Sequence, residues 1–433
     1  METLQKLAVL ADAAKYDASC ASSGAPRRHS KNKAGLGTTN GDGICHSFTP
    51  DGRCISLLKI LLTNFCLYDC QYCINRRTSN VQRARFTVDE VVRLTLDFYR
   101  RNYIEGLFLS SGVIRSSDYT MEQLVNVARA LRIEHQFRGY IHLKTIPDAS
   151  SELIELAGRY ADRLSVNIEL PTEIAMEQLA PEKKVSTIKL AMATIRKKVD
   201  ETQEEKNSTK SLSKAAEQAL RFSPAGQSTQ MIVGADATCD RTILDTSQNL
   251  YASYRLKRVY YSAFSPIPQS PSTVPSEAPP LLREHRLYQA DFLIRSYGFQ
   301  AQELLTINSN LDLEIDPKLA WALNHRDLFP VDLNRAELHL IARVPGIGIK
   351  NAERIHALRL IRRVKYADLI RLRCSLKKAQ PFITLDDWKP RQAEIDSQTL
   401  RQTLTNQSTA KLPNHPYSSG FKAKQTQLSL WQN

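Results

Sequence analysis

The chain has 433 residues, of which 42% are hydrophobic and 24% are charged, and it carries a formal net charge of +14 and eight cysteines. This length suffices for a sizeable core and more than one domain. Eight cysteines in so long a chain exclude a disulfide scaffold. The absence of any run near 18 apolar residues excludes a membrane span. The positive charge indicates an anionic partner, such as nucleic acid or an acidic surface.

The first 53 residues are predicted to be a flexible N-terminal segment. An amphipathic helix around Leu4 and Leu7 begins it, and residues 22–43 are rich in Gly, Ser, Lys and Arg. This polar stretch is either a flexible cover over a site or plain disorder. Residues 1–10 lack a long apolar core, so we expect no signal peptide and a cytoplasmic protein. Cys20, Cys45 and Cys54 are irregularly spaced, and a second cluster or metal site is one interpretation of them.

Strand and helix patterns alternate from residue 55 onward. Capping boxes are predicted at two helix starts, Thr87 with Glu90 and Thr120 with Gln123, and Asp240 is the N-cap expected for a later helix. Repeated alternation of this kind is typical of a parallel sheet covered by helices. The sequence therefore predicts an α/β domain with six strands, at 55–63, 106–111, 140–146, 164–170, 229–234 and 257–264.

Three cysteines lie in the loop that leaves the first of these strands. Cys66, Cys70 and Cys73 fall within eight residues, directly after the apolar run 55–62. Three thiolates at this spacing can converge on one metal centre, and a centre with three protein ligands keeps a position open for chemistry. The alternative is a zinc knuckle that lacks one ligand, although zinc loops favour paired Cys-x2-Cys spacings.

The pattern Cys-x3-Cys-x-aromatic-Cys, with Tyr72 as the aromatic residue, resembles the signature of the radical S-adenosylmethionine (SAM) enzymes. The resemblance implies that the three cysteines ligate a [4Fe–4S] cluster and that SAM chelates the fourth iron. It implies reductive cleavage of SAM to methionine and a 5′-deoxyadenosyl radical, with an electron supplied by a reductant such as flavodoxin or ferredoxin. It also implies a partial (β/α)6 TIM-like barrel, here over residues 54–265, with its active site at the strand C-terminal ends.

Polar residues and glycines follow the other predicted strands, and the resemblance suggests that they bind SAM together with Tyr72 of the cysteine motif. Ser110-Ser111-Gly112 stands where the family receives the amino group of SAM, without the family's acidic residue. Asn167 and Glu169 could bind the ribose hydroxyls or part of the amino acid. Ile232 and Gly234 partly match the segment that contacts adenine. Lys144, Tyr260 and Tyr261 are candidates to line the substrate cavity; for the tyrosines, packing within a strand is the alternative.

Two stretches are assigned no chemistry. Residues 196–214 are charged and polar, and are expected to form an exposed helix or a mobile insertion. The run 265–280 contains six prolines, and such a run cannot continue a barrel strand and behaves as a stiff spacer. Residues 266–330 are therefore predicted to be a linker with helices, near 281–298 and 316–324, that ends the catalytic domain.

A hairpin between two helical patterns marks a second domain at residues 331–385. The stretch 344–350 reads Val-Pro-Gly-Ile-Gly-Ile-Lys and resembles the helix-hairpin-helix family, which implies a small all-α DNA-binding domain. Such a hairpin presents backbone N–H groups at a helix N-terminus to a phosphate. Residues 333–378 hold 12 Lys or Arg against 3 Asp or Glu. The candidate DNA-binding residues are Pro345, Gly346, Gly348, Lys350 and Arg354; a hairpin for protein contacts is the alternative.

The order of the cysteine motif and the hairpin resembles a bacterial family of radical SAM proteins assigned to DNA modification or repair. Phrases such as 51–59, 109–113 and 259–262 carry this resemblance. It implies a class of enzyme without a defined reaction, and the family's association with a uracil-DNA-glycosylase-like partner favours DNA over RNA as the substrate. RNA modification, tRNA included, is the first alternative. The second is a DNA-binding protein whose cluster is structural or senses redox state; SAM cleavage would distinguish it from both enzymes.

The last segment, residues 386–433, is predicted to be a disordered tail because residues 392–426 are polar and lack a helical or strand period. Its end resembles the pentapeptide that binds the bacterial sliding clamp, with Trp in place of Phe. A tethered peptide of this kind can insert apolar side chains into a groove. Folding back onto its own domain is the alternative. The candidate clamp-binding residues are Gln427, Leu428, Ser429, Leu430 and Trp431.

Overall fold

The structure is a computed structural model that describes residues 1–14, 44–48, 54–146, 148–208, 222–267, 271–305, 309–391 and 400–409. The described residues divide into two compact units. The barrel unit comprises those up to Asp291 together with those between Gln300 and Leu311, and the C-terminal unit comprises 292–299 and those from Asp312 onward. In neither unit is a described helix both long and apolar enough to span a bilayer.

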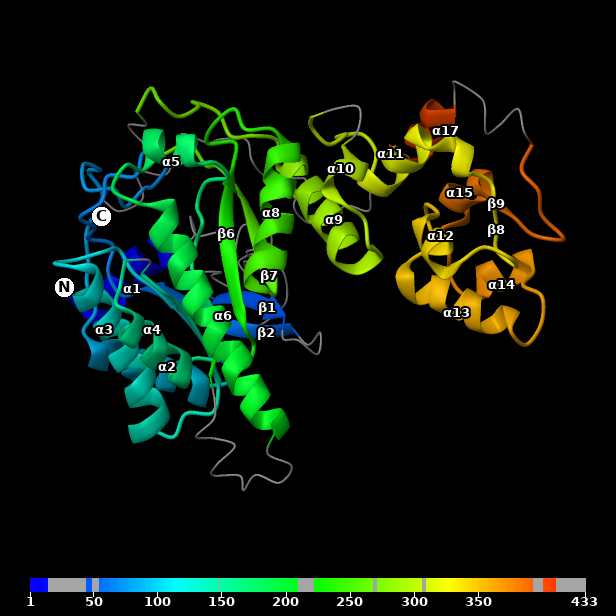
Figure 1. The fold of residues 1–433 in the computed structure, drawn as a ribbon. Helices are drawn as coiled ribbons and strands as arrows, with labels where there is room; N and C mark the ends of the chain where they lie inside the picture. Colours follow the sequence, from blue (N-terminus) through cyan, green and yellow to red (C-terminus); the bar gives the residue numbers. More distant parts are fainter. Residues whose placement is uncertain are drawn as a thin grey trace, which may run out of the picture. The chain divides into compact units, whose positions relative to one another are not determined.

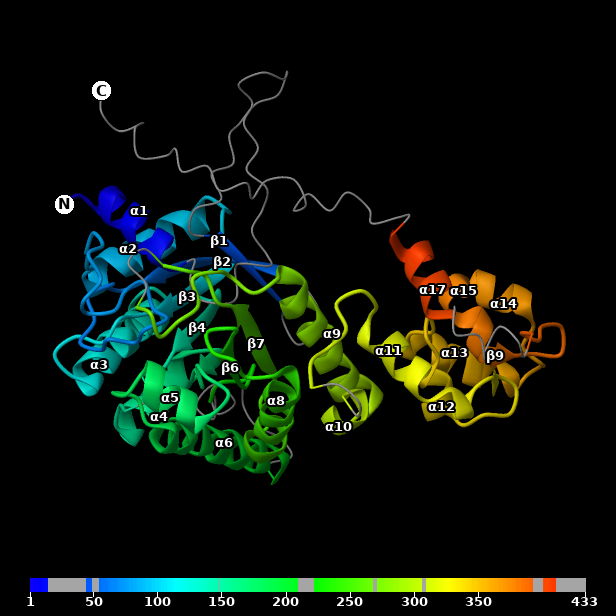
Figure 2. The same cartoon turned by 90° about the horizontal axis from the view of Figure 1, so that it is seen from above.

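A curled sheet of seven strands forms the centre of the barrel unit (Figures 1 and 2). The strands follow one another around the sheet in chain order, β2 to β7 are parallel, and β1 pairs with β2 in the antiparallel sense. This arrangement confirms the predicted α/β partial barrel with six parallel strands. The strands are β1 (Ile44–Phe48), β2 (Cys54–Leu61), β3 (Gly106–Ser110), β4 (Tyr140–Lys144), β5 (Arg163–Ser165), β6 (Gln227–Val233) and β7 (Arg258–Ala263).

Helices alternate with the strands, and α3, α4, α6 and α8 lie along the outer side of the curled sheet (Figure 2). The parallel sheet is therefore covered as its apolar strands require. A turn of π-helix over Ala130–Glu134 extends α3. The bounds are α1 (Thr3–Ala13), α2 (Val88–Arg100), α3 (Ser117–Arg129), α4 (Ser151–Tyr160), α5 (Glu173–Leu179), α6 (Val185–Ser208) and α8 (Asp240–Tyr254).

One of the three predicted helix starts matches the structure. Thr87 and Glu90 form the predicted capping box of α2. The start at Thr120 was wrong, because the N-cap of α3 is Ser116, whose hydroxyl accepts from the Tyr119 N–H at 3.1 Å. Asp240 is the first residue of α8 rather than its cap. Its carboxylate instead accepts bonds from the Leu311 N–H at 2.9 Å and the Arg283 guanidinium at 2.7 Å.

The prediction that residues 1–53 form a flexible segment was wrong for the part that the structure describes. Helix α1 buries Leu10, and its Lys6 pairs with Glu90 of α2 at 2.8 Å. Strand β1 adds an antiparallel edge to the sheet, and its Cys45 is 2% exposed. These elements are short, but each gains an apolar partner from the barrel, and tertiary packing stabilises what local propensity does not.

The proline-rich segment does not end the barrel unit at residue 265 as predicted. Helix α9 (Leu281–Tyr297) packs its first part against β7: Glu284 accepts from the Ala263 N–H at 2.8 Å, and the Tyr288 hydroxyl donates to the Tyr261 carbonyl at 2.9 Å. A Cβ on Gly234, at the end of β6, would lie 2.7 Å from Pro279. The described part of the segment therefore folds back onto the barrel. Helix α10 (Ala301–Leu304) completes this unit.

The C-terminal unit is helical, as predicted, with an aromatic core. Phe299, Trp321 and Phe382 are at most 2% exposed, and Phe299 and Trp321 pack edge to face with centroids 5.1 Å apart. A short parallel pair joins β8 (Val331–Asp332) and β9 (Ile383–Thr384). The helices are α11 (Pro317–Asn324), α12 (Leu338–Arg343), α13 (Ile349–Arg359), α14 (Tyr366–Arg371), α15 (Leu376–Ala379) and α17 (Leu400–Thr409).

Helix α17 corrects the prediction that the tail has no regular structure. Its Leu400 and Leu404, one turn apart, are 6% and 4% exposed. Arg401 forms an ion pair with Asp312 of the same unit at 2.6 Å. The polar composition of this stretch concealed two leucines at helical spacing. The clamp-like residues 427–431 lie outside the described residues.

Candidate active site

The loop that carries the three cysteines is fixed by hydrogen bonds to its backbone. Arg83 donates from Nη2 to the carbonyls of Arg76 at 2.6 Å and Ser79 at 2.9 Å. Its Nη1 donates to the carbonyl of Asn75 at 2.9 Å and also to that of Asn64. One guanidinium therefore satisfies four carbonyls before and after the cysteines, which is the use of Arg as a planar fork of donors. Arg83 was not identified from the sequence.

Of the three cysteines, Cys70 is buried and Cys66 and Cys73 are partly buried. Burial raises the pKa of the Cys70 thiol to about 11 and that of the Cys73 thiol to about 12. At neutral pH both therefore keep their protons unless a cation takes their place. A coordinating metal deprotonates such thiols outright, so this pair suits a metal centre better than nucleophilic chemistry, which needs a depressed pKa.

The described residues contain no group of three or more Cys, His, Asp or Glu placed to hold a single metal ion. An iron–sulfur cube differs from a single ion, because each thiolate binds a different iron atom and the sulfurs need not converge on one point. The three cysteines fit such a group because all three line one cavity.

That cavity lies at the C-terminal ends of the strands, where the sequence analysis expected the site. Seven of the eight residues predicted to bind SAM share it with the cysteines, and Lys144 lines it too. Side chains that follow β2, β3, β5 and β6 are therefore brought together from four separate places in the chain. The seven are Tyr72, Ser110, Ser111, Gly112, Asn167, Glu169 and Ile232.

Gly234 is the exception, and it does not line the cavity. Its φ of +80° is a conformation that favours glycine. A Cβ on this residue would lie 2.7 Å from the ring of Pro279. Both features concern backbone packing. The structure therefore accounts for this glycine without a ligand.

Gly112 connects the end of β3 to the cysteine loop. A Cβ here would lie 2.2 Å from the carbonyl oxygen of Phe65, so only glycine fits. Its N–H donates to the Thr63 carbonyl at 2.8 Å, and the Leu67 N–H donates to the Val113 carbonyl at 2.8 Å. These bonds extend the pairing of β2 and β3 on both sides of Cys66. The sequence analysis expected this glycine to approach a ligand, whereas its close neighbour is the backbone of the cysteine loop.

A buried ion pair occupies one wall of the cavity. Lys183, just before α6, lies 2.9 Å from the carboxylate of Glu169, and Lys144 lies 4.0 Å from the same oxygen. Burial lowers the pKa of Lys183, but several opposing interactions, of which the charge of Glu169 is the largest, together outweigh burial and hold the pKa well above its ordinary value. Lys183 is therefore a cation, 3.5 Å from the Tyr72 hydroxyl. Burial in turn raises the pKa of Tyr72 well above its usual range.

Glu169 is held in an unusual backbone conformation. Its φ is +64°, although its N–H and C=O both bond to β6, to the Gln230 carbonyl at 3.0 Å and the Ile232 N–H at 2.7 Å. Such strain in a non-glycine residue persists only where the surroundings fix it, and it is concentrated at functional sites. Lys183 was missed because it lies between the expected strands 164–170 and 229–234 and no local pattern marked it.

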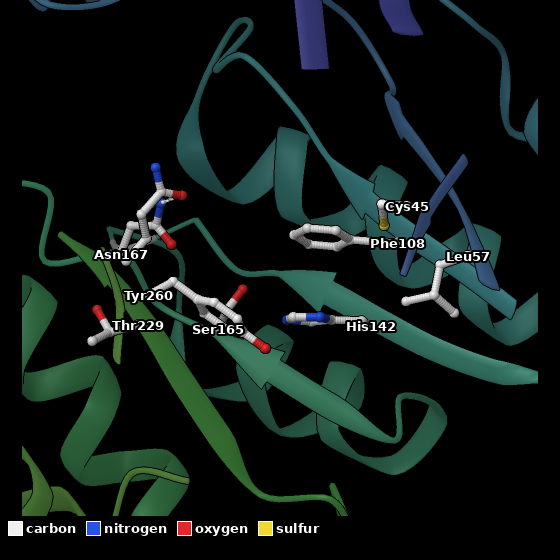
Figure 3. A pocket seen from close by; sticks show the side chains of 9 residues that line it. Cys45, Leu57, Phe108, His142, Ser165, Asn167, Thr229 and Tyr260 are labelled. Atoms are coloured by element: carbon white, nitrogen blue, oxygen red, sulfur yellow. Dashed lines mark hydrogen bonds between the residues drawn. The ribbon is translucent and has the colours of Figure 1, made fainter. Parts of the chain in front are cut away.

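A second, smaller cavity lies inside the barrel (Figure 3). Asn167 and Gln230 line both cavities and bond to each other at 3.0 Å, so this pair separates them. The inner cavity has a volume of about 20 Å³, enough for about one water molecule. The ring of His142 stacks on Phe108 at a centroid distance of 4.2 Å. Cys45, Ser165, Thr229 and Tyr260 complete the polar side of its lining.

The two tyrosines of β7 point in different directions. Tyr260 lines the inner cavity, as a residue facing the barrel interior should. Tyr261 is fully buried on the opposite side, where its hydroxyl donates to Ser247 at 2.9 Å and to Asp291 at 3.3 Å. The suggestion that Tyr261 lines the substrate cavity was therefore wrong, because neighbouring residues of a strand alternate between faces.

The second cluster suggested for Cys20, Cys45 and Cys54 gains no support from the described residues. Cys45 faces the inner cavity, and Cys54 is paired with Phe48 across the first two strands. Cys20 lies outside the described residues.

The hairpin of the C-terminal unit joins α12 to α13 as the sequence predicts, but its glycines have different surroundings. Gly346 has a φ of +80°, and a Cβ on it would lie 2.4 Å from the Ser375 carbonyl, so it packs inside its own unit. Gly348 is the N-cap of α13, and a Cβ there would meet only the Tyr297 hydroxyl, at 3.7 Å. Pro345 is buried, while Lys350 and Arg354 are exposed.

Two side chains from earlier in the chain form hydrogen bonds with the hairpin backbone. The Ile349 N–H donates to the Tyr297 hydroxyl at 3.0 Å, and the Lys318 ammonium donates to the Ile347 carbonyl at 2.6 Å. Burial lowers the pKa of Lys318 to about 7. One of the amides that would face a phosphate is thus already bonded, which the hairpin sequence alone could not reveal.

Comparison with known proteins matches one part of the chain to a protein family. Residues 60–204 match the family model described as "Radical SAM superfamily". No curated protein matches the chain. Among solved structures, it is similar to the [FeFe]-hydrogenase maturase HydG (12% identity, TM-score 0.38, 55% of this chain and 48% of that one) and to HydG from Carboxydothermus hydrogenoformans (15%, 0.40, 55% and 50%). A third is methylornithine synthase, PylB (13%, 0.38, 68% of each chain). The chain spans about half the length of the two maturases, and similarity at this level carries no inference about substrate.

Proposed function

Because this chain belongs to the radical SAM superfamily over residues 60–204, we propose that it cleaves SAM at a cluster held by Cys66, Cys70 and Cys73 and thereby modifies or repairs DNA. The superfamily implies a [4Fe–4S] cluster and SAM as cofactors, and a reductant. When bound, the cluster supplies the electron for reductive cleavage of SAM to methionine and a 5′-deoxyadenosyl radical. The single observation that carries the proposal is that one cavity gathers the three thiols and the polar ends of the neighbouring strands.

The polar residues of the cavity are suited to hold a zwitterionic amino acid and a ribose. Lys183 can hold a carboxylate and Glu169 an ammonium group, because the two are charged and lie 2.9 Å apart at the cavity wall. Ser110, Ser111 and the Gly112 backbone lie beside the cysteine loop and suit the amino group. Asn167 offers an amide to the ribose hydroxyls, and Ile232 an apolar surface to adenine.

The cofactor part of the proposal is tested by anaerobic reconstitution. We expect the protein to bind about four irons, and expect Cys66, Cys70 and Cys73 replaced together by Ala to bind none at that site. Cys239→Ala is the matched control, because Cys239 is a partly exposed cysteine that does not line the cavity. Iron content and the visible absorption of the cluster are the readouts. Equal iron in the triple variant and in the control would remove the three cysteines from the proposal.

The nucleic-acid part rests on the basic surface of the C-terminal unit. Arg335 and Arg371 have side chains that are 79% and 78% exposed, and Lys350 and Arg354 are exposed on α13. Exposed cations that contact phosphates give affinity with little sequence preference. Since Gly346 is committed to internal packing, we assign the phosphate contacts to the Lys350 and Arg354 side chains, with the Gly348 backbone as the part of the hairpin left open.

Substitution of these two cations tests the assignment. Lys350→Glu with Arg354→Glu should weaken binding to duplex DNA by about 100-fold at low salt and flatten its salt dependence. Competition between duplex DNA and tRNA on the unmodified protein then distinguishes a DNA enzyme from an RNA enzyme. Mass spectrometry of nucleosides from cells with and without the protein identifies the product. A tRNA preference would overturn the DNA assignment and leave SAM cleavage untouched.

A further inference from the structure

The residues on either side of Cys66 expose apolar side chains to solvent. Phe65 is 46% exposed and Leu67 is 44% exposed, whereas Cys66 itself lines the cavity. The alternation is imposed by the backbone: Gly112 and Val113 bond to the loop on each side, as described above. The cysteine therefore faces inward and its two neighbours face outward. Two large apolar side chains held outward beside a cluster ligand have no role in binding SAM.

Two arginines are fixed next to this pair by one tyrosine. Arg85 donates to the Tyr119 hydroxyl at 2.8 Å, and the guanidinium of Arg115 lies 4.6 Å from the centroid of the same ring. The backbone brings them to Phe65 and Leu67, because Arg85 is bridged to Thr63 and Arg115 follows Val113 by two residues. The hydrogen bond from Arg85 lowers the pKa of Tyr119. Both cations therefore contact the same tyrosine, and Arg115 remains exposed.

Cations outnumber acidic groups among the charges that act most on Tyr119. Arg85 and Arg115 lower the pKa of Tyr119, and Glu122 acts in the opposite sense. Asp118, one residue before Tyr119, accepts from the Ser150 N–H at 2.6 Å. Arg83 adds a third cation, whose charge acts on Cys66 and Cys73. We call Phe65, Leu67, Arg85, Arg115 and Tyr119 the Cys66 rim.

We propose that the Cys66 rim is the docking surface for an acidic one-electron donor protein, and this proposal rests on the function proposed above. An apolar centre with charged groups around it is the composition of a protein interface. Complementary charge orients a transient partner and raises its association rate. One electron passes from the reduced flavin or iron–sulfur centre of the donor to the oxidised cluster, so the donor is oxidised by one electron and the cluster is reduced by one. The cavity side of Cys66 remains available to SAM and substrate.

The test compares two reductants in the reconstituted holoenzyme. The double variant Arg85→Glu with Arg115→Glu is reduced either by a flavodoxin hydroquinone or by dithionite, which needs no docking surface. We expect the initial rate of 5′-deoxyadenosine formation with flavodoxin to fall by about 10-fold at low salt, and the rate with dithionite to stay at the wild-type value. Unchanged dithionite activity also shows that the variant is folded and holds its cluster.

The matched control reverses two arginines at the opposite end of the barrel. Arg129 closes α3 and Arg138 precedes β4; both are exposed, and replacing both by Glu makes the same change in charge. This control should keep the wild-type flavodoxin rate. Calorimetric binding of flavodoxin to each protein is the readout that does not depend on catalysis, and only the Arg85, Arg115 variant should lose affinity.

Three results would overturn the proposal: equal flavodoxin rates in the two double variants, equal flavodoxin affinities, or a loss of affinity for duplex DNA rather than for flavodoxin in the rim variant. The last would assign the surface to nucleic acid. Failure of the proposed function looks different, because wild-type protein would then cleave no SAM even with dithionite. In that case the flavodoxin affinities still decide whether the rim binds the donor.

Discussion

The cysteine cavity of the barrel unit and the hairpin of the C-terminal unit were both identified from short glycine- or cysteine-containing motifs. The surroundings of the motif residues differ between the two regions. In the cavity, seven predicted residues from four strand ends share one space with the three thiols. In the hairpin, Gly346 is packed against Ser375 and the Ile349 N–H is already bonded to Tyr297. The C-terminal ends of the parallel strands lie together at one end of the barrel. Residues that follow one strand are therefore brought close to those that follow the neighbouring strands. A hairpin fixes only its own shape, and later packing decides what it exposes.

The largest effect is expected at the buried ion pair of the cavity. Lys183→Met leaves the carboxylate of Glu169 with the more distant Lys144, and breaking a buried pair costs about 3–5 kcal/mol. We expect urea unfolding to show this loss and equilibrium dialysis to show weaker SAM binding. Lys189→Met on α6 is the control, because its pair with Glu173 of α5 is exposed and should contribute less than about 1 kcal/mol. Equal losses in the two variants would contradict a special role for the cavity pair.

Substitution of each hairpin glycine by alanine tests whether Gly346 and Gly348 differ in packing as the structure indicates. Gly346→Ala should destabilise the C-terminal unit by about 2–3 kcal/mol, because it combines a φ of +80° with a Cβ 2.4 Å from the Ser375 carbonyl. Gly348→Ala should cost about 1 kcal/mol or less, since its φ is −79° and the space around it is open. The measurement is thermal unfolding of the full chain. If Gly348→Ala proves the more damaging, the packing described for the hairpin is wrong.

The corresponding glycine substitution in the barrel unit, Gly112→Ala, is expected to affect the metal site as well as stability. Gly112→Ala places a Cβ 2.2 Å from the Phe65 carbonyl and must displace the loop before Cys66. We expect a cost of about 1–3 kcal/mol together with a lower iron content after reconstitution. Gly348→Ala again serves as the control and should keep the full iron content. A Gly112→Ala protein with wild-type iron would show that the loop tolerates displacement without loss of the site.

The smallest effect is a pH dependence that belongs to the hairpin. The pKa of Lys318 is lowered to about 7 by burial, while an unfolded lysine titrates near 10.4. Between these values the unfolded chain binds more protons, so the C-terminal unit should gain about 1 kcal/mol of stability per pH unit from roughly pH 7.5 to pH 9. Lys318→Met should remove this gain. An unchanged slope in that variant would assign the pH dependence to another group.

The sequence predicted the barrel well because its signals are local and repeated. Strand periods, turn residues and a capping box at Thr87 each depend on a few neighbouring residues, and the order of strands then follows from the right-handed connection rule. The three cysteines and seven pocket residues could be located because each lies near the C-terminal end of an expected strand or in the loop that leaves it. Lys183 and Arg83 could not, since a side chain that reaches a site from a loop or a helix start leaves no periodic signal.

The errors have a common physical cause as well. Strand β1, the packing of Pro279 on Gly234 and helix α17 all depend on partners that are distant in the chain. Polar composition around these elements suggested flexibility, but a few apolar residues, such as Leu400 and Leu404, suffice when the partner surface is already folded. Tertiary packing of this kind cannot be derived from the pattern of one segment alone.

The most direct test of the central claim is the yield of 5′-deoxyadenosine from SAM in anaerobically reconstituted protein reduced with dithionite. The account predicts that the wild-type protein and Cys239→Ala form it at similar rates and that the variant with Cys66, Cys70 and Cys73 replaced by Ala forms none. Formation of 5′-deoxyadenosine by the triple variant at the wild-type rate would contradict the assignment of this cavity as the site of SAM cleavage.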